Sequence, residues 1–358
     1  MDFGLTEEQQ AVADLATQIL TDKVDMERLM AIEASDEWFD RDAYQALADA
    51  GLVGIALGED IGGGGLDIVA FGQALTAQGL TVAPMPLLPT GMAALAIDTY
   101  GSDELRQAIL PGVCAGSTVL TYAVQEPNDD RLGTPSTAFA DGTITGTKSV
   151  VEFFTHADHL VVSTDQGLAV VDGPGADPTI TATEGSSTRK EPVHLLEFAG
   201  TPATLLGGGP DAVGWLVDRA TACLCATQLG VTEKALQLTA AYTTEREQFG
   251  RPIATFQAVV QRLADQYINI GGIRLNSTNV LWRLAHDLDV DEDLPVAKWW
   301  ASERATDVAH ATQHCHGGMG VSVDYPLYRY TLWNKHIATS LGGGTQQLRR
   351  LGQALATG

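Results

Sequence analysis

The hydrophobic pattern of the chain changes its period twice, and this change limits the folds that the sequence can adopt. Up to about residue 116 the apolar residues follow a helical period, residues 117–208 carry short β-rich runs, and from residue 209 the helical period returns. Strands gathered between two helical parts are typical of an α+β protein. We therefore predict an N-terminal helical domain (1–116), a middle β-domain (117–208) and a C-terminal helical bundle (209–358).

Several helix ends can be recognised. Thr6 and Gln9 have the spacing of a capping box ahead of an apolar face. One long helix is predicted from a stripe of apolar residues, namely Phe256, Val259, Val260, Leu263, Tyr267 and Ile270. The other predicted helices cover residues 40–50 (ending at Gly51), 103–110 (closed by Pro111 and Gly112), 294–315 and 345–355, and Pro84, Pro86 and Pro89 predict a break.

Turn residues mark the middle of the chain. Asp141-Gly142 lies between two β-rich runs and predicts a hairpin. The β-rich runs cover residues 119–124, 143–151, 159–163 and 193–198. The glycine run 62–65 predicts a turn, because a phosphate-binding loop would need a preceding strand and a following Lys-Ser or Lys-Thr.

The charge of the chain excludes some functions. A net charge of −24 repels nucleic-acid backbones and anionic lipid. The sequence has neither an export signal at its start nor a run of 18 apolar residues, and its four cysteines lack the spacing of a zinc site or a disulfide framework. We expect a cytoplasmic protein that binds no metal, nucleic acid or membrane.

Three segments together carry a family resemblance. Residues 242–257 read YTTEREQFGRPIATFQ, residues 314–320 read HCHGGMG, and residues 57–65 read LGEDIGGGG. Their order and spacing resemble those of the flavin-dependent acyl-CoA dehydrogenases over nearly the whole chain, with the β-domain matching least. The resemblance implies N-terminal helices, a middle β-domain and a C-terminal four-helix bundle, with FAD bound partly across a subunit interface.

The resemblance also implies which residues of this chain would contact FAD. Arg246 would pair with the pyrophosphate, as a guanidinium does well, although a surface salt bridge with Glu245 or Glu247 is the alternative. Phe249 would pack on the cofactor. The remaining implied contacts are Gln248, Gln257, His314 (usually glutamine in the family), Gly317, Gly318 and Thr345.

The catalytic base of the family is missing. The reaction removes a proton from the α-carbon of an acyl thioester, and in many members the glutamate that takes it precedes Gly-Thr near the C-terminus. Gly343 occupies that position here. A second known position, ten residues before Gly230, holds Ala220, and Asp218 should face away from it because two residues turn a helix by about 200°. We predict no catalytic residue in this chain.

The β-domain departs from the family as well. Residues 125–131 read QEPNDDR where the family has Glu-Pro-Gly-Ala-Gly-Ser-Asp, and residues 149–152 read SVVE in place of a Trp-Ile-Thr that packs against the flavin. Acidic side chains facing an anionic cofactor would be unfavourable. The flavin pocket of this chain is therefore predicted to be degraded, whereas the residues that it would lend to a neighbour are retained.

This asymmetry is similar to the small, base-less subunit of actinobacterial α2β2 steroid-CoA dehydrogenases, which desaturate a shortened cholesterol side chain. The resemblance implies a half-site subunit that is inactive alone and completes the FAD site of a paralogous subunit carrying the glutamate. An acyl-CoA would be the substrate and an electron-transferring flavoprotein a possible acceptor. Two alternatives stay open: a self-sufficient flavoenzyme with a displaced base, and a structural homologue without a cofactor.

Overall fold

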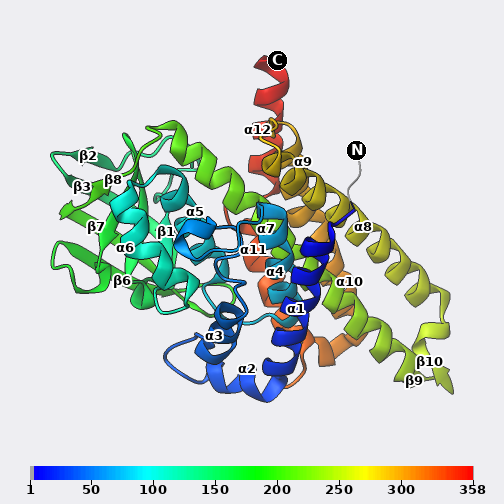
Figure 1. The fold of residues 1–358 in the computed structure, drawn as a ribbon. Helices are drawn as coiled ribbons and strands as arrows, with labels where there is room; N and C mark the ends of the chain where they lie inside the picture. The colour runs from blue at the N-terminus through cyan, green and yellow to red at the C-terminus, as the bar shows by residue number, and fades with distance from the viewer. Residues whose placement is uncertain (1–3, 358) are drawn as a thin grey trace. The chain divides into compact units, whose positions relative to one another are not determined.

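The computed structural model describes residues 4–357, and the chain divides into two compact units. Unit 1 comprises Met1–Met26, Gly72–Ala83 and Ala222–Gly358, and unit 2 comprises Glu27–Phe71 and Pro84–Thr221. Along the chain, helices come first, strands occupy the middle and helices return (Figure 1), which confirms the predicted α+β class. The predicted domain ranges 1–116, 117–208 and 209–358 follow chain order and stay a prediction.

The first part of the chain is helical, as predicted. Its helices are α1 (Glu7–Lys23), α2 (Met26–Glu33), α3 (Arg41–Asp49), α4 (Ile68–Thr81), α5 (Leu87–Tyr100) and α6 (Asp103–Cys114). The capping box is confirmed, because the Gln9 N–H donates to Thr6 Oγ1 over 3.2 Å and the Thr6 N–H donates to Gln9 Oε1 over 3.1 Å. The sequence did not predict α2, whose eight residues bury only Leu29 and Ile32 and so carry a weak periodic signal.

Two prolines were wrongly predicted to end or break structure. Pro89 lies in the first turn of α5, where a backbone N–H has no partner within the helix and its absence costs little. Pro111 lies inside α6, which continues to Cys114. The helix resumes past the proline because the Ala115 N–H reaches the Pro111 carbonyl over 3.0 Å and the Val113 side chain is fully buried.

The glycine run is a turn, as predicted. A short 3₁₀ helix, Glu59–Ile61, ends at Gly62 in the left-handed conformation with φ of 87°. At Gly63 a Cβ atom would collide with the Leu57 carbonyl, so only glycine fits.

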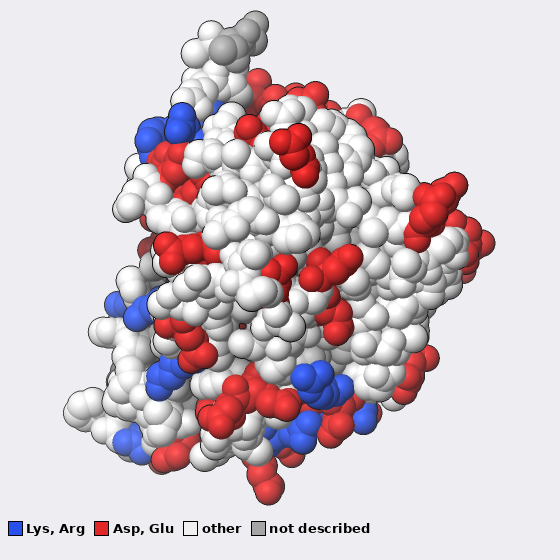
Figure 2. Space-filling view, turned by 90° about the vertical axis from the view of Figure 1, so that its left-hand side faces the viewer, with Lys and Arg blue, Asp and Glu red and all other residues white. Residues whose placement is uncertain are grey.

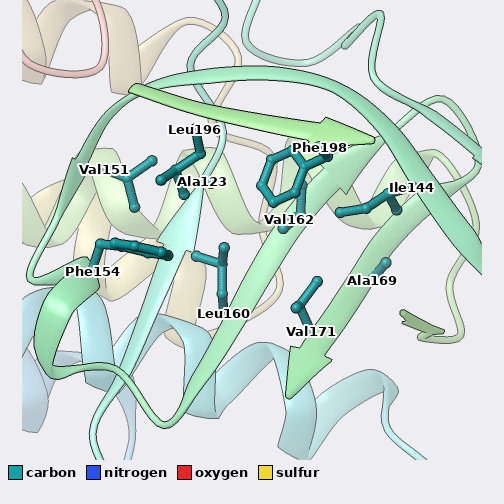
Figure 3. Close-up of a cluster of buried hydrophobic side chains, with 10 residues drawn as sticks. All are labelled: Ala123, Ile144, Val151, Phe154, Leu160, Val162, Ala169, Val171, Leu196 and Phe198. Atoms are coloured by element: carbon teal, nitrogen blue, oxygen red, sulfur yellow. The ribbon is translucent and has the colours of Figure 1, made fainter. Parts of the chain in front are cut away.

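The strands of unit 2 form two sheets that share one core. One sheet has the order β1 (Leu120–Ala123), β4 (His159–Thr164), β5 (Gly167–Asp172), β8 (Thr204–Leu205), and the other has the order β2 (Ala138–Ala140), β3 (Thr143–Glu152), β7 (Pro192–Pro202), β6 (Ile180–Ser186). Buried side chains of both sheets, among them Leu160 and Phe198, point toward one another (Figure 3). Asp141 and Gly142 have φ of 51° and 76°, which confirms the predicted hairpin between β2 and β3.

The last part of the chain consists of long helices. They are α7 (Asp211–Glu245), α8 (Gln257–Ala285), α9 (Asp293–Trp299), α10 (Ala305–His316), α11 (Leu327–Thr339) and α12 (Gly344–Thr357). A π-helical turn, Trp300–Arg304, joins α9 to α10, so the helix predicted at 294–315 is continuous. Close packing of α4 on α7 depends on glycine, because a Cβ atom at Gly79 or Gly230 would collide with the backbone of the other helix.

The apolar stripe predicted for α8 is only partly buried. Ile270 is buried, but Val260 and Tyr267 are 50% and 72% exposed. The buried side of α8 is instead formed by Gln266, Ile270, Ile273, Ser277, Val280, Leu281 and Leu284. The outer side, with Val260, Tyr267, Ile268 and Leu275, forms an exposed apolar face of this helix.

The surface is acidic, in keeping with the net charge. Asp and Glu side chains are spread over the face drawn in Figure 2, where Lys and Arg form small groups. Among residues 4–357, no helix combines the length and the apolar character needed to cross a membrane.

Candidate cofactor-binding site

A short hairpin after α7 presents an aromatic ring to solvent. Its strands are β9 (Glu247–Gln248) and β10 (Arg251–Pro252), joined by Phe249 and Gly250 with φ of 55° and 80°. Such turns favour Asn-Gly, because a large residue is strained at positive φ. Phe249 is nevertheless 95% exposed. Neither turn formation nor burial explains a phenylalanine at this position.

Two contacts stiffen the base of the hairpin. The Phe249 ring lies edge-on to Phe256, with 6.2 Å between ring centroids, and the Arg251 guanidinium covers the Phe256 ring at 4.2 Å. Gln257, which follows Phe256, is exposed at the start of α8. Gln248 is also exposed, and its Nε2 donates to the Glu247 carbonyl over 2.7 Å.

Arg246 is held by its backbone, whereas its side chain is exposed. Its N–H donates to the Tyr242 carbonyl and its carbonyl accepts from the Ile253 N–H, both over 2.8 Å. Within residues 4–357 the guanidinium forms no ion pair, so the alternative of a salt bridge with Glu245 or Glu247 is absent from this structure. The side chain is therefore available to an anionic group.

The glycine pair ends α10 in an open turn. Gly317 has φ of 59° and ψ of −135°, a conformation that is open essentially to glycine alone. A Cβ atom at Gly317 or Gly318 would have no neighbour within 4 Å, and both residues are exposed. His314 is exposed in the last turn of the same helix. A ligand can thus approach this backbone closely.

Stacked rings connect the hairpin to the glycine turn. Tyr242, in the last turn of α7, stacks on His316, the last residue of α10, with centroids 4.3 Å apart and an interplanar angle of 22°. Tyr325 packs on both rings, edge-on to Tyr242 and tilted to His316. The structure therefore links the segment of Arg246 and Phe249 to the segment of Gly317 and Gly318.

Thr345 lies apart from these segments. It is exposed in the first turn of α12, beside Gly344, whose position is packed against Glu303 of the π-turn. Glu303 precedes His316 by 13 residues of one continuous helix, which corresponds to about 20 Å at 1.5 Å per residue. The structure does not bring Thr345 beside the other predicted FAD contacts.

Gly343, at the position of the missing base, precedes α12. Its N–H donates to Gln346 Oε1 over 2.9 Å and its carbonyl accepts from the Gln347 N–H over 3.1 Å. A Cβ atom at Gly343 would meet only the Ala338 carbonyl, at 3.6 Å. Space is therefore not the reason for this glycine. At the second known base position, Ala220 is buried in α7, and Asp218 is half-buried two residues before it.

A substitution at Gly343 tests whether the missing base is the only reason why the isolated chain would be inactive. We expect Gly343→Glu to fold with a free energy of unfolding within about 1 kcal/mol of the parent, because the site is open. We expect the isolated variant to remain inactive toward acyl-CoAs, since a base alone does not restore a flavin pocket. Thermal melting and flavin-reduction assays measure both. Gly344→Glu is the control at a crowded position and should be less stable than Gly343→Glu, because its Cβ atom would push aside the Glu303 side chain. Activity of isolated Gly343→Glu would contradict the expectation.

In unit 2, the Glu126 carboxylate is fully hydrogen-bonded within the chain itself. Its carboxylate accepts from the backbone and side chain of Ser136 and Thr137 and from Lys148 Nζ over 2.8 Å, while Lys148 has no exposed surface. Burial opposes ionisation, but the hydrogen bonds from Lys148 and the hydroxyls lower the pKa of Glu126 to about 2. In the same segment, residues 125–131, the negative charge of Asp129 is balanced by Arg131, whose guanidinium lies 2.7 Å away.

Glu152, in the segment that replaces Trp-Ile-Thr, belongs to an ionic cluster. The Arg189 guanidinium lies 3.1 Å from Glu152 and 2.7 Å from the buried Glu191. Burial raises the pKa of Glu191 to about 7, although Arg189 acts in the opposite direction. Val150 in the same segment has φ of 55°, which is strained for a β-branched residue. A charged cluster replaces the small hydroxyl and flat ring expected beside a flavin.

Part of this arrangement was not predicted from the sequence. Tyr242 and Tyr325 received no role, and His316 was noted only as part of a motif. Their packing becomes visible only in three dimensions, because they come from α7, the end of α10 and the segment before α11. A sequence signal existed for Tyr242 alone, which lies one helical turn before Arg246.

Comparisons with known proteins agree with this fold. The chain matches "Acyl-CoA dehydrogenase, N-terminal domain" over residues 6–117 and "Acyl-CoA dehydrogenase, C-terminal domain" over residues 207–355. It is 38% identical to acyl-CoA dehydrogenase FadE27 of Mycobacterium tuberculosis, over 99% of both chains. It is also 43% identical to a chain of the Tcur3481-Tcur3483 steroid ACAD, over 98% of both chains with a TM-score of 0.93. For the ChsE4-ChsE5 complex of Mycobacterium tuberculosis the identity is 37%, the coverage 100% of both chains and the TM-score 0.93. The chain therefore belongs to the acyl-CoA dehydrogenase family and has the fold of that family.

Proposed function

We propose that this chain is the half-site subunit of a heteromeric, FAD-dependent acyl-CoA dehydrogenase. It completes the FAD site of a paralogous subunit that carries the catalytic glutamate, and the complex desaturates a bulky acyl-CoA such as a steroid side-chain thioester. The observation that carries the proposal is the exposed, strained Phe249 beside an unpaired Arg246, in a chain whose base position is Gly343.

The residues of this chain would contact different parts of FAD, and the partner would supply the catalytic base. Arg246 would hold the pyrophosphate, Phe249 would cover the cofactor, and the backbone at Gly317 and Gly318 would contact the adenosine half, with Gln248, Gln257 and His314 adding polar contacts. Thr345, which lies apart, is the least supported contact. Bound FAD supplies hydride acceptance from the β-carbon. The partner would remove the α-proton, and an electron-transferring flavoprotein would reoxidise the complex.

The β-domain supports an empty flavin pocket in this chain. In the cluster of Arg189 with Glu152 and Glu191, the ion pair of Glu152 with Arg189 places charged groups where the family has Trp-Ile-Thr. An isoalloxazine ring packed there would have to desolvate this cluster or break it, and both are costly. One FAD site for each pair of subunits is the consequence.

The outer face of α8 supports a partner. Val260, Tyr267, Ile268 and Leu275 are 50% to 72% exposed, which is unfavourable for an isolated chain. Two similar structures are described as a steroid ACAD named for two proteins and as a ChsE4-ChsE5 complex. These neighbours support a heteromer and a steroid substrate for this chain, although the acyl group itself is set by the partner in this proposal.

The test is to express the chain alone and together with a paralogous acyl-CoA dehydrogenase encoded beside it. Native mass spectrometry and flavin absorbance then give the composition and the FAD content. We expect a colourless, inactive protein from the chain alone. We expect an active α2β2 complex with one FAD for each pair of different subunits when both are present.

The same measurements decide between the alternatives. A yellow, active protein from the chain alone, with one FAD per chain, would support a self-sufficient flavoenzyme with a displaced base. A stable homo-oligomer that binds no FAD with or without the partner would support a purely structural homologue. Either result overturns the proposal.

A further inference from the structure

His316 is the polar member of the ring cluster that joins the hairpin to the glycine turn. It is 4% exposed and lies between Tyr242 of α7 and Tyr325 ahead of α11. It is also the last residue of α10 and directly precedes Gly317. A movement of this ring would therefore displace both segments that carry the predicted FAD contacts.

The hydrogen bonds of His316 select one form of the ring. Nδ1 lies 2.9 Å from the Thr312 carbonyl, which can only accept, so Nδ1 carries a proton. Nε2 lies 3.1 Å from the Tyr325 hydroxyl and then accepts from it. The neutral ring thus satisfies both nitrogens. A second proton at Nε2 would face the Tyr325 O–H and force the hydroxyl to turn away.

The surroundings of His316 contain no compensating charge among the groups that act on it. Burial lowers the pKa of His316 from its usual 6.5, and the bond to Thr312 offsets this only in part. The titratable groups that face the ring are Tyr242 from α7 and Tyr325 from the segment before α11. The Glu245 carboxylate of α7 acts on Tyr325, whose pKa burial and this charge both raise.

We propose that neutral His316 is a positioning residue that holds the hairpin of Arg246 and Phe249 against the Gly317-Gly318 turn, and that its protonation loosens the FAD half-site. This inference rests on the proposed function. The direction of the pH dependence follows because the neutral ring is the form that fits. The half-site is intact above pH 6.5 and loosens as the pH falls below that value. The residue need not touch FAD to have this effect.

The experiment measures FAD affinity of the co-expressed complex between pH 8 and pH 5, in a His314→Gln background. That background removes the exposed histidine that the proposed function places beside the cofactor, so that His316 is the histidine under test. If FAD binding shifts the pKa of His316 by one unit, FAD should bind about tenfold more weakly at the acidic end of this pH range. His316→Phe keeps the stacked ring, so we expect it to abolish this pH dependence. His310→Phe, which alters an exposed histidine of the same helix, should leave it unchanged.

Two further measurements test the positioning role of His316 independently of the proposed function. Tyr325→Phe removes the hydroxyl that donates to Nε2 of the neutral ring, so the pH response should move to higher pH. Hydrogen exchange of residues 246–253, corrected for the intrinsic effect of pH, should rise on acidification in the parent but not in His316→Phe. If FAD binding needs Arg246 but keeps its pH dependence in His316→Phe, this inference fails alone. If Arg246→Ala changes nothing while the exchange response is present, the proposed function fails and the positioning role stands.

Discussion

Replacing Arg246 by alanine is expected to strip FAD from the complex of this chain and its partner. Truncating one member of a hydrogen-bonded charge pair costs about 2 kcal/mol or more. The dissociation constant for FAD should therefore rise by about thirtyfold or more. The measurement is the flavin absorbance retained after gel filtration, followed by titration with FAD. Subunit assembly should persist, because the side chain makes no ion pair within the described chain.

Two variants sharpen this experiment. Arg246→Lys keeps the charge and loses the planar fork, so its FAD affinity should lie between those of the parent and the alanine variant. Arg41→Ala is the control for loss of an exposed arginine, since Arg41 lies in unit 2, where it contacts Glu37, His156 and the Phe39 ring. Unchanged FAD content in Arg246→Ala would remove Arg246 from the site.

Of the substitutions proposed for this chain, Glu126→Gln is expected to lower the free energy of unfolding most. The substitution leaves the Lys148 ammonium, which has no exposed surface, without its counter-charge. Removing one partner of a buried ion pair costs about 3–5 kcal/mol. Chemical denaturation of the complex, or of the chain where it is soluble alone, measures the change. Glu184→Gln is the control, because Glu184 is 69% exposed and lies 4.0 Å from His194, so its loss should change stability little.

The buried pair also gives a pH signature. The pKa of Glu126 is lowered from its usual 4.5 to about 2, so its contribution to stability is complete above pH 4.5 and is lost as the pH falls toward 2. Glu126→Gln should lack this acid-dependent component. The double variant Glu126→Gln/Lys148→Met should lose less stability than the sum of the single variants, because no unpaired charge remains. Additive losses would show that the pair is not coupled.

Local patterns were reliable where neighbours in the sequence decide the structure. The capping box of Thr6 and Gln9 and the hairpin at Asp141-Gly142 depend on a few adjacent residues, and both are present. The prolines show the limit of local rules. Pro111 does not end α6, because the full burial of Val113 beyond it outweighs the lost hydrogen bond.

The residues of the candidate site remain a prediction from motifs, and their arrangement could not be read from the sequence. The segment of Arg246 and Phe249 and the glycine pair could be recognised from their motifs, whereas the rings that join them could not. His316 gains its role from Tyr242 and Tyr325, which different helices bring to it. The pairing of Glu152 with Arg189 was equally invisible, since the three strands β4, β5 and β6 separate them along the chain.

The sequence by itself determined the order of helices and strands, the tight turns and the absence of a side chain at Gly343, because these depend on residue type and on near neighbours. The tertiary structure alone decided that Phe249 and the outer face of α8 are exposed, that Arg246 is unpaired and that Thr345 lies apart from the glycine turn. Exposure and pairing depend on which distant segments pack against a residue, and periodicity carries no information about that choice.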